Sequence, residues 1–243
     1  MTISLSAQGL RAILLDIEGT TTPMAFVHDV LFPFARAHVS GFLRRRGDTA
    51  SVRRAVARLE EECAADQAAG AAPPALVLDY VYWLMDRDRK STGLKALQGL
   101  VWQEGFEAGT LRGRVYPDVP PALARWSTRG FEVDIYSSGS VLAQRLLFGT
   151  TPVGDLTTFL TRYFDTQIGP KGDPDSYRRI AGEIDMEPAA ILFVSDVETE
   201  LDAAHGAGLH TALCVRSDTD AEAGAEPRAT AHAVVRTFDD ILD

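Results

Sequence analysis

The chain of 243 residues is 46% hydrophobic and 24% charged, which is typical of a soluble globular protein and excludes a disordered, collagen-like or membrane-embedded chain. Its 24 Lys and Arg residues against 34 Asp and Glu residues give a net charge of −10, which opposes non-specific binding to nucleic acid or anionic lipid. Cys63 and Cys214 form neither a CxxC nor a Cys/His pattern, so we expect no disulfide framework and no zinc site. The first residues lack a basic leader and a membrane-length apolar run, so we expect a cytoplasmic protein.

Short apolar runs that alternate with helical patterns organise the chain. We predict strands at these runs, which are 12–15, 133–136, 190–194, 211–215 and 233–237. Between them, Pro120 and Pro121 mark a helix start, Gly130 a helix end, and Ser140–Phe148 keeps helical spacing. Buried strands that alternate with helices indicate a parallel sheet covered on both faces. The sequence therefore predicts an α/β fold with a Rossmann-like parallel sheet.

A long insertion separates the first predicted strand from the second. A crossover between parallel strands needs only roughly a dozen residues or somewhat more, and far more are present here. The insertion contains helical patterns, the first of which Pro33 must kink or divide; the others are 51–65, 75–85 and 92–107. We therefore predict a catalytic core of residues 1–20 and 116–243, with an all-helical cap inserted over 21–115.

Two acidic residues follow the first predicted strand. Asp16 and Glu18 lie two residues apart, and the sequence then enters a loop rich in Gly, Thr and Pro. Ligands of open α/β sheets bind at the carboxyl ends of the strands. An acid at that edge can attack a phosphoryl group, and a second acid can donate and then accept the proton. Taken alone, Asp16 fits a turn or helix cap equally well.

Three further features lie at predicted strand ends or in a constrained loop. Ser137 and Ser138 follow the second strand and precede a helix, where hydroxyl and backbone N–H groups can bind phosphate or simply cap the helix. Lys171 lies in a loop containing Gly and Pro, and its charge could neutralise a nucleophilic acid and a phosphoryl group. Asp196 follows the third run, and with Asp16 it offers the oxygen ligands that Mg²⁺ prefers.

Acid, serine, lysine and acid in this order resemble the four motifs of the haloacid dehalogenase superfamily of phosphatases. Several stretches are more closely similar to the enolase-phosphatase E1 family of methionine salvage, which has glutamate where most of the superfamily has aspartate, here at Glu18. These stretches, spread over residues 11–211, are 16–23, 136–141, 147–149, 164–166, 195–197 and 200–204.

The resemblance implies a Mg²⁺-dependent bifunctional enzyme. Members enolise 2,3-diketo-5-methylthiopentyl-1-phosphate and then hydrolyse its phosphate ester to give the acireductone 1,2-dihydroxy-3-keto-5-methylthiopentene. Carried over by position, Asp16 is the nucleophile and a metal ligand, Glu18 is the acid/base residue and contacts the metal, and Asp196 completes the metal site. Whether Glu18 uses its side chain or its backbone carbonyl for the metal stays open.

The resemblance also implies how the substrate is held. Ser137 and Ser138 contact the substrate, and Lys171 holds the phosphoryl group against Asp16. The implied protein is a cytoplasmic monomer with one Mg²⁺ per subunit, a small phosphate ester as substrate, and neither nucleic acid nor membrane as partner. The sequence identifies no enolising base, although Glu18 is the nearest candidate by position.

Other functions fit the pattern less well. The nearest alternative is a phosphatase of the same fold that acts on another small phosphate ester, because the motifs fix the reaction while the cap fixes the substrate. A response-regulator receiver has its lysine after both acidic motifs, whereas here Lys171 precedes Asp196. A hydrolytic dehalogenase needs no metal, which leaves Asp196 unexplained. The five histidines, none in a metal-binding spacing, are assigned structural or surface roles.

Overall fold

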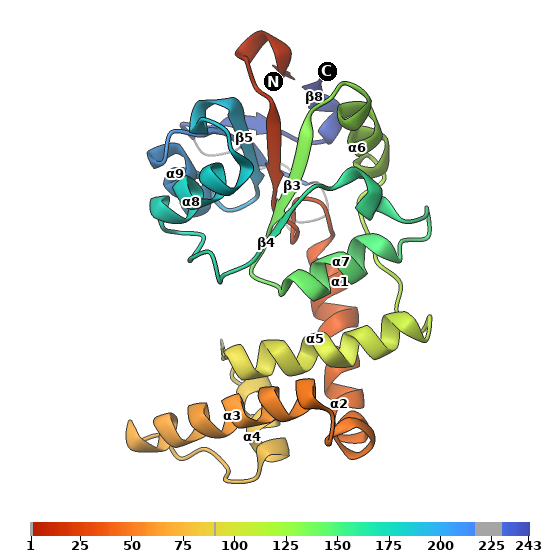
Figure 1. Cartoon of the computed structure of the whole chain (residues 1–243), viewed down its shortest axis with the longest axis vertical. Coiled ribbons are helices and arrows are strands. Elements are labelled where there is room, and N and C mark those ends of the chain that lie inside the picture. The colour runs from red at the N-terminus through yellow and green to blue at the C-terminus, as the bar shows by residue number, and fades with distance from the viewer. Residues whose placement is uncertain (1, 90, 217–229) are drawn as a thin grey trace. The chain divides into compact units, whose positions relative to one another are not determined.

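The computed structural model describes residues 2–89, 91–216 and 230–243 (Figure 1). The chain forms two compact units. One unit comprises Met1–Phe26 and Arg112–Asp243, and the other comprises Val27–Leu111. The sequence places the two junctions a few residues away, at 20/21 and 115/116. Among the described residues no helix combines the length and the apolar character that crossing a membrane requires.

A six-stranded parallel sheet forms the centre of the first unit, with strand order β4-β3-β2-β5-β6-β7. Its strands are β2 (Ala12–Leu15), β3 (Glu132–Tyr136), β4 (Tyr163–Phe164), β5 (Ile191–Ser195), β6 (His210–Cys214) and β7 (Ala233–Val235). The strand β2 lies in the middle, where Leu14 is in register with Asp134 of β3 and Phe193 of β5. The predicted α/β fold is therefore confirmed, and the sheet includes the short strand β4, which the sequence patterns did not indicate.

Helices cover both faces of this sheet. They are α6 (Val119–Thr128), α7 (Val141–Gly149), α8 (Pro174–Ile184) and α9 (Glu198–Gly206), with 3-10 turns at Leu156–Phe159 and Pro188–Ala190. Figure 1 shows α8 and α9 on one side of the strands and α6 on the other. Leu14, Phe193, Tyr177 and Leu201 pack together between the sheet and the pair α8 and α9, and each is fully buried. Burying a side chain of this size stabilises the fold by about 1.5–3 kcal/mol.

The two ends of the chain pair beside the main sheet. The strand β1 (Ile3–Ser4) and the strand β8 (Ile241–Leu242) run parallel, and the 3-10 turns Ser6–Gln8 and Phe238–Asp240 flank them. The ring of Trp126, on α6, lies 5.4 Å from that of Phe238. This contact anchors the C-terminal segment to the helix.

The second unit is helical. The short helix α1 (Met24–Phe26) leads into a π-helical turn (Val27–Leu31), which is followed by α2 (Phe32–Arg46), α3 (Ala50–Ala68), α4 (Val77–Met85) and α5 (Thr92–Glu107). The expected interruption at Pro33 is confirmed: the π-helical turn ends just before it, and the ring, which has no N–H to donate, lies in the first turn of α2. A Cβ at Gly93 would lie 2.7 Å from Cγ of Leu59, so this glycine lets α5 pack closely on α3.

The two cysteines are free. Cys63 lies on α3 and Cys214 ends β6, and both are buried. Burial raises the pKa of both thiols, that of Cys214 to about 12, which makes both poor nucleophiles at neutral pH. Neither thiol is therefore suited to act as a nucleophile in this protein.

One buried carboxylate in the core makes stability depend on pH. Asp134 is fully buried on β3, and no described residue donates a hydrogen bond to either of its carboxylate oxygens. Its nearest cation is Arg162, whose Nη1 lies 3.6 Å from Oδ1. Burial raises the pKa of Asp134 from 3.8 to about 6, a difference worth about 3 kcal/mol.

We therefore expect Asp134→Asn to stabilise the protein at high pH. The folded protein holds a proton on Asp134 more tightly than the unfolded chain does, so this group costs stability as the pH rises from about 4 to about 6. The Asn variant removes that cost, so its melting temperature should exceed the wild-type value at pH 8 and match it near pH 4. Melting curves of both proteins at pH 4 and pH 8 measure this. The same difference in melting temperature between variant and wild type at the two pH values would contradict the prediction.

Candidate active site

Asp16 is the first residue after β2, at the carboxyl end of the central strand. Its backbone N–H donates to the Val194 carbonyl at 3.0 Å, which continues the pairing with β5, and the residue as a whole is only 5% exposed. A tight turn follows, in which the amides of Thr20, Thr21 and Thr22 all point at the Ile17 carbonyl, at 3.2, 2.9 and 2.8 Å. The nucleophile predicted from the sequence is thus held by the sheet on one side and by this turn on the other.

Glu18 and Asp196 flank the same turn. The backbone of Glu18 bridges to Thr22, and its side chain is half-buried. Gly19 has a φ of +72°, and a Cβ at this position would lie 2.1 Å from Oδ2 of Asp196. Only glycine permits this approach of the backbone to the carboxylate. The turn after β2 therefore packs directly on the acid that follows β5.

Lys171 reaches Asp16 from the loop before α8. Its Nζ donates to Oδ1 of Asp16 at 2.6 Å, and both side chains are 7% exposed. The hydroxyl of Tyr177 donates to the Lys171 carbonyl at 2.7 Å, and that of Tyr136 donates to the Gly169 carbonyl at 2.9 Å. Two core tyrosines thus fix the backbone of this loop. The predicted lysine and the predicted nucleophile form a direct ion pair.

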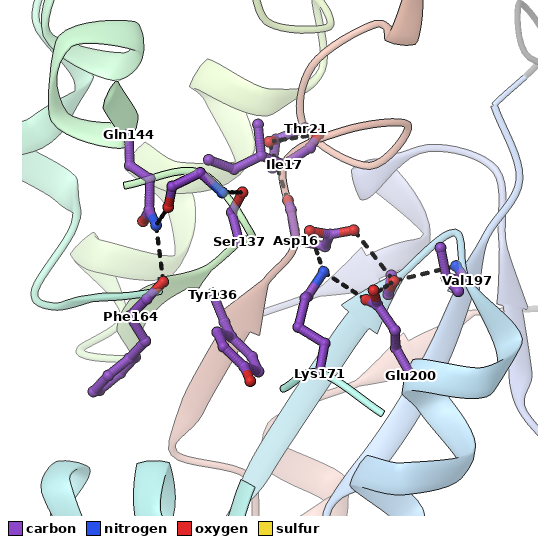
Figure 2. A network of polar contacts seen from close by, with 12 residues as sticks. Asp16, Ile17, Thr21, Tyr136, Ser137, Gln144, Phe164, Lys171, Val197 and Glu200 are labelled. Carbon is purple, nitrogen blue, oxygen red and sulfur yellow. Dashed lines mark hydrogen bonds and ion pairs between the residues drawn. The ribbon is translucent and has the colours of Figure 1, made fainter. Parts of the chain in front are cut away.

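Glu200, in the first turn of α9, joins this ion pair. Its Oε2 lies 2.5 Å from Nζ of Lys171, so the ammonium group lies between two carboxylates (Figure 2). The hydroxyl of Ser195 lies 3.1 Å from Oε2 of Glu200 and 3.3 Å from Oδ2 of Asp16. Both residues lie in the stretches that resemble the enolase-phosphatase E1 family, but the sequence assigned neither of them a catalytic role. The sequence signal that could have identified them is their spacing from Asp196: Ser195 lies one residue before it, and Glu200 lies four residues after it.

Ser137 and Ser138 follow β3 at the same edge of the sheet. Ser137 is buried, and its Oγ accepts a hydrogen bond from the Gly139 amide at 3.1 Å, whereas Ser138 is exposed. The helix cap is Ser140, whose Oγ accepts from the Ala143 amide. Capping therefore does not explain the two predicted serines. The side-chain amide of Gln144 supports their loop, since it donates to the Gly139 and Phe164 carbonyls at 2.9 and 2.8 Å (Figure 2).

Negative charge exceeds positive charge at this edge of the sheet. Burial, followed by the charge of Asp16, raises the pKa of Asp196 to about 7. The same two causes raise the pKa of Glu200 against the opposing effect of Lys171. Burial disfavours the charge of Lys171, but Asp16 and Glu200 outweigh it and raise the lysine pKa. The single ammonium group of Lys171 is therefore surrounded by three carboxylates, and this cluster of four side chains has a net negative charge when all of them are ionised.

A divalent cation suits this charge balance. The described residues contain no cluster of three or more His, Cys, Asp or Glu side chains arranged as a metal site. Mg²⁺, however, takes only one or two carboxylates and fills its other positions with water and phosphate oxygens. Asp16 and Asp196, which directly follow the adjacent strands β2 and β5, provide such a pair. The chemistry of these donors fits Mg²⁺, whereas a side-chain contact from Glu18 stays a prediction.

Comparison with known proteins gives the family. The model of haloacid dehalogenase-like hydrolases matches residues 10–208. Enolase-phosphatase E1 of Klebsiella oxytoca is 47% identical over 232 residues, which is 96% of each chain. The chain belongs to the enolase-phosphatase E1 family. The Synechococcus elongatus enolase-phosphatase E1, 47% identical, covers 85% of this chain and 89% of its own length.

Solved structures share the fold of this chain. The UTR4 protein of Saccharomyces cerevisiae is 32% identical and superposes with a TM-score of 0.73 over 95% of this chain and 99% of its own. CbbY from Rhodobacter sphaeroides is only 17% identical, with a TM-score of 0.56 over 94% of this chain and 95% of its own. The second likeness shows the shared fold alone.

We expect Glu200→Gln to lower phosphate release by about 10- to 100-fold, because a charge-assisted hydrogen bond is worth about 1.5–3 kcal/mol. Glutamine keeps the size of Glu200 and a contact with Ser195, but it removes one of the two charges that hold Lys171. Steady-state phosphate release measures the effect. Glu198→Gln makes the same change at an exposed position of the same helical turn and should leave the rate unchanged. Equal rates in the two variants would contradict a role for Glu200.

Proposed function

We propose that this protein is a Mg²⁺-dependent enolase-phosphatase. It would enolise 2,3-diketo-5-methylthiopentyl-1-phosphate and then hydrolyse the phosphate ester to the acireductone. The observation that carries the hydrolytic half is the ion pair between Asp16 and Lys171 at the carboxyl edge of the sheet. Identity of 44–47% to six enterobacterial enolase-phosphatases, over 96% of each chain, supports this substrate.

Phosphate transfer would begin at Asp16. Lys171 holds Oδ1 of Asp16, and Oδ2, which accepts only a long hydrogen bond of 3.3 Å from the Ser195 hydroxyl, would attack the phosphorus atom. The bond from phosphorus to the ester oxygen breaks as the new bond forms, and Glu18 donates a proton to the departing oxygen. The product of this step is an aspartyl phosphate on Asp16 and the dephosphorylated enol.

Hydrolysis of the aspartyl phosphate would reuse the same two acids. Glu18, now ionised, accepts a proton from a water molecule, whose oxygen attacks the phosphorus atom. The bond between phosphorus and Asp16 breaks, which regenerates the carboxylate and releases inorganic phosphate. Lys171 offsets the charge that develops on the transferring group, and Ser137 and Ser138 bind its oxygens.

Mg²⁺ would be held by Asp16 and Asp196, with Glu18 as the third predicted ligand. When bound, the ion neutralises charge between the acids and the phosphate dianion and orients the phosphoryl group. The burial of Asp196 and the nearby charge of Asp16, which together raise the pKa of Asp196 although Lys171 lowers it, support this placement, because a cation held here would offset that repulsion.

Enolisation requires a base beside the carbon next to a carbonyl group. Glu18 is the candidate nearest to the nucleophile along the chain, and no other residue is proposed for this step. The helical unit Val27–Leu111 is proposed as the cap that selects the methylthio chain. The free cysteines support a reducing compartment, and we include a cytoplasmic monomer in the proposal.

A paired assay on the purified protein tests this function. Ultraviolet absorbance follows formation of the enol from the diketo phosphate, and a colorimetric reaction follows free phosphate. We expect both signals with Mg²⁺ and neither after EDTA, with recovery when Mg²⁺ is returned. Phosphate release from a panel of other esters, with no activity on the diketo phosphate, would instead identify a phosphatase of the same mechanism with a different substrate.

A further inference from the structure

A buried arginine binds the turn that carries Glu18. Arg216 lies two residues after β6 and is 4% exposed. Its Nε and Nη2 both donate to the Thr20 carbonyl, at 3.0 and 2.7 Å. Thr20 lies four residues after Asp16 and two after Glu18. One guanidinium group thus holds the turn by two hydrogen bonds to a single backbone oxygen.

The guanidinium group of Arg216 is itself fixed on its other sides. Its Nη1 lies 2.6 Å from Oδ2 of Asp118, and that oxygen also accepts a hydrogen bond from the Phe238 amide at 2.6 Å. The rings of Tyr116 and Phe238 lie 4.4 and 4.7 Å from its central carbon. A buried charge with this many partners has little freedom to move. Arg216 therefore presents its remaining N–H groups to the turn in one orientation.

Tyr116, which packs against Arg216, makes a further hydrogen bond to the turn. The Tyr116 amide donates to the Thr21 carbonyl at 3.0 Å, and Tyr116 also lies against Arg216. Consecutive carbonyls of the turn, at Thr20 and Thr21, are thus held from segments far away in the sequence. The opposite side of the turn packs Gly19 against Asp196. A displacement of Thr20 would carry Glu18 and Gly19 with it, away from Asp16 and Asp196.

We propose that Arg216 is a positioning residue, which holds the turn after Asp16 so that Glu18 stays aligned for proton transfer. The proposal rests on the proposed phosphatase function. It requires arginine, because lysine has a single nitrogen and cannot place two N–H groups on Thr20 while a third remains on Asp118.

The test compares two Arg→Lys variants. Arg125 is the matched control, because its Nη2 also donates to two backbone carbonyls, those of Phe238 and Ile241 at 2.9 and 3.1 Å. Its ion pair is with Asp239, so these contacts of Arg125 are with the C-terminal segment and not with the turn after Asp16. For Arg216→Lys we expect kcat for phosphate release to fall by about 100-fold with KM near the wild-type value, the effect of a small misplacement at the reacting groups. Arg125→Lys should retain the wild-type kcat.

Hydrogen exchange gives a readout that does not depend on activity. In Arg216→Lys, a peptide covering residues 16–23 should exchange its amides faster than in the wild type and in Arg125→Lys. Unchanged exchange in this peptide, or a loss confined to KM, would overturn the positioning role. A wild-type protein that releases no phosphate from any ester would overturn the proposed function and with it the catalytic reason for the contact, whereas faster exchange in Arg216→Lys would still show that Arg216 holds the turn.

A second variant covers the case in which Arg216→Lys does not fold. Asp118→Asn keeps the size of the side chain and one oxygen that can accept from Arg216 and the Phe238 amide, while it removes the charge and replaces the other oxygen by an NH₂ group. We expect a smaller fall in kcat and a smaller rise in exchange over 16–23, both in the same direction. Wild-type kcat together with wild-type exchange in this variant would overturn the proposal.

Discussion

Replacing Asp16 by Asn is expected to abolish phosphate release, with a fall in rate of about 10⁴-fold or more, as is found when the group that forms the covalent intermediate is removed. The amide has nearly the shape of the carboxylate, so the backbone bond to Val194 and the turn after β2 should persist. It has no ionised oxygen to attack phosphorus, and it pairs only weakly with Lys171. Phosphate release and a melting curve measure the two effects.

The matched control for this variant is Asp134→Asn. It makes the same chemical change in a buried acid on the adjacent strand β3. Asp134 lies inside its strand, in register with Leu14, and not at the carboxyl edge of the sheet where Asp16 lies. Phosphate release should remain at the wild-type rate in the control. Glu18→Gln should slow release without removing the nucleophile. Full activity in Asp16→Asn would show that another group attacks the substrate.

Replacing Lys171 by Met is expected to lower phosphate release by about 10³-fold, the effect of losing a positioned cation in a site of low dielectric. Methionine fills much of the same volume, but it leaves Asp16 and Glu200 facing each other without the ammonium group that lies 2.6 and 2.5 Å from them. Breaking a buried ion pair from one side also costs about 3–5 kcal/mol of stability. Both the rate and the melting temperature should therefore fall.

The stability loss in Lys171→Met should depend on pH. Without the ammonium group, the carboxyls of Glu200 and Asp196, whose pKa values are already raised, bind protons still more tightly in the folded state. Stability then falls as the pH rises through their pKa values, so the difference from wild type should be larger at pH 8 than at pH 5. Lys95→Met, in the helical unit, is the control. A pH-independent difference would contradict this account.

The sequence predicted the central strands because their signals are local, and it predicted that Asp16 follows the first of them. The run Ala12–Leu15 is apolar at every position, and it ends at Asp16 in the structure as the pattern indicates. Parallel strands bring their carboxyl ends to one edge, and in the structure β2 and β5 are also adjacent, so their ends are neighbours. The contact between Asp16 and Lys171 needed more, namely the order of the four motifs.

Other features could not be predicted, for reasons that differ. The helix α8 begins at Pro174, within a stretch of Gly and Pro that favours a loop. The signals for this helix in the sequence are weak, namely the capping residue Asp173 and the apolar spacing that follows. Glu200 lies in the first turn of a helix, where acids are common for electrostatic reasons unconnected with catalysis. Arg216 binds a backbone oxygen 196 residues away, and no local pattern encodes such a contact.

The close packing of Gly19 on Asp196 limits how this protein can be redesigned. Any other residue at position 19 meets two obstacles at once, the positive φ of the backbone and an atom 2.1 Å from its Cβ. Because the obstacle is the carboxylate of Asp196, a change at position 19 cannot be compensated by shortening its partner without removing a proposed metal ligand. A mutant library aimed at new substrates should therefore keep this glycine codon constant and place its diversity in the helical unit.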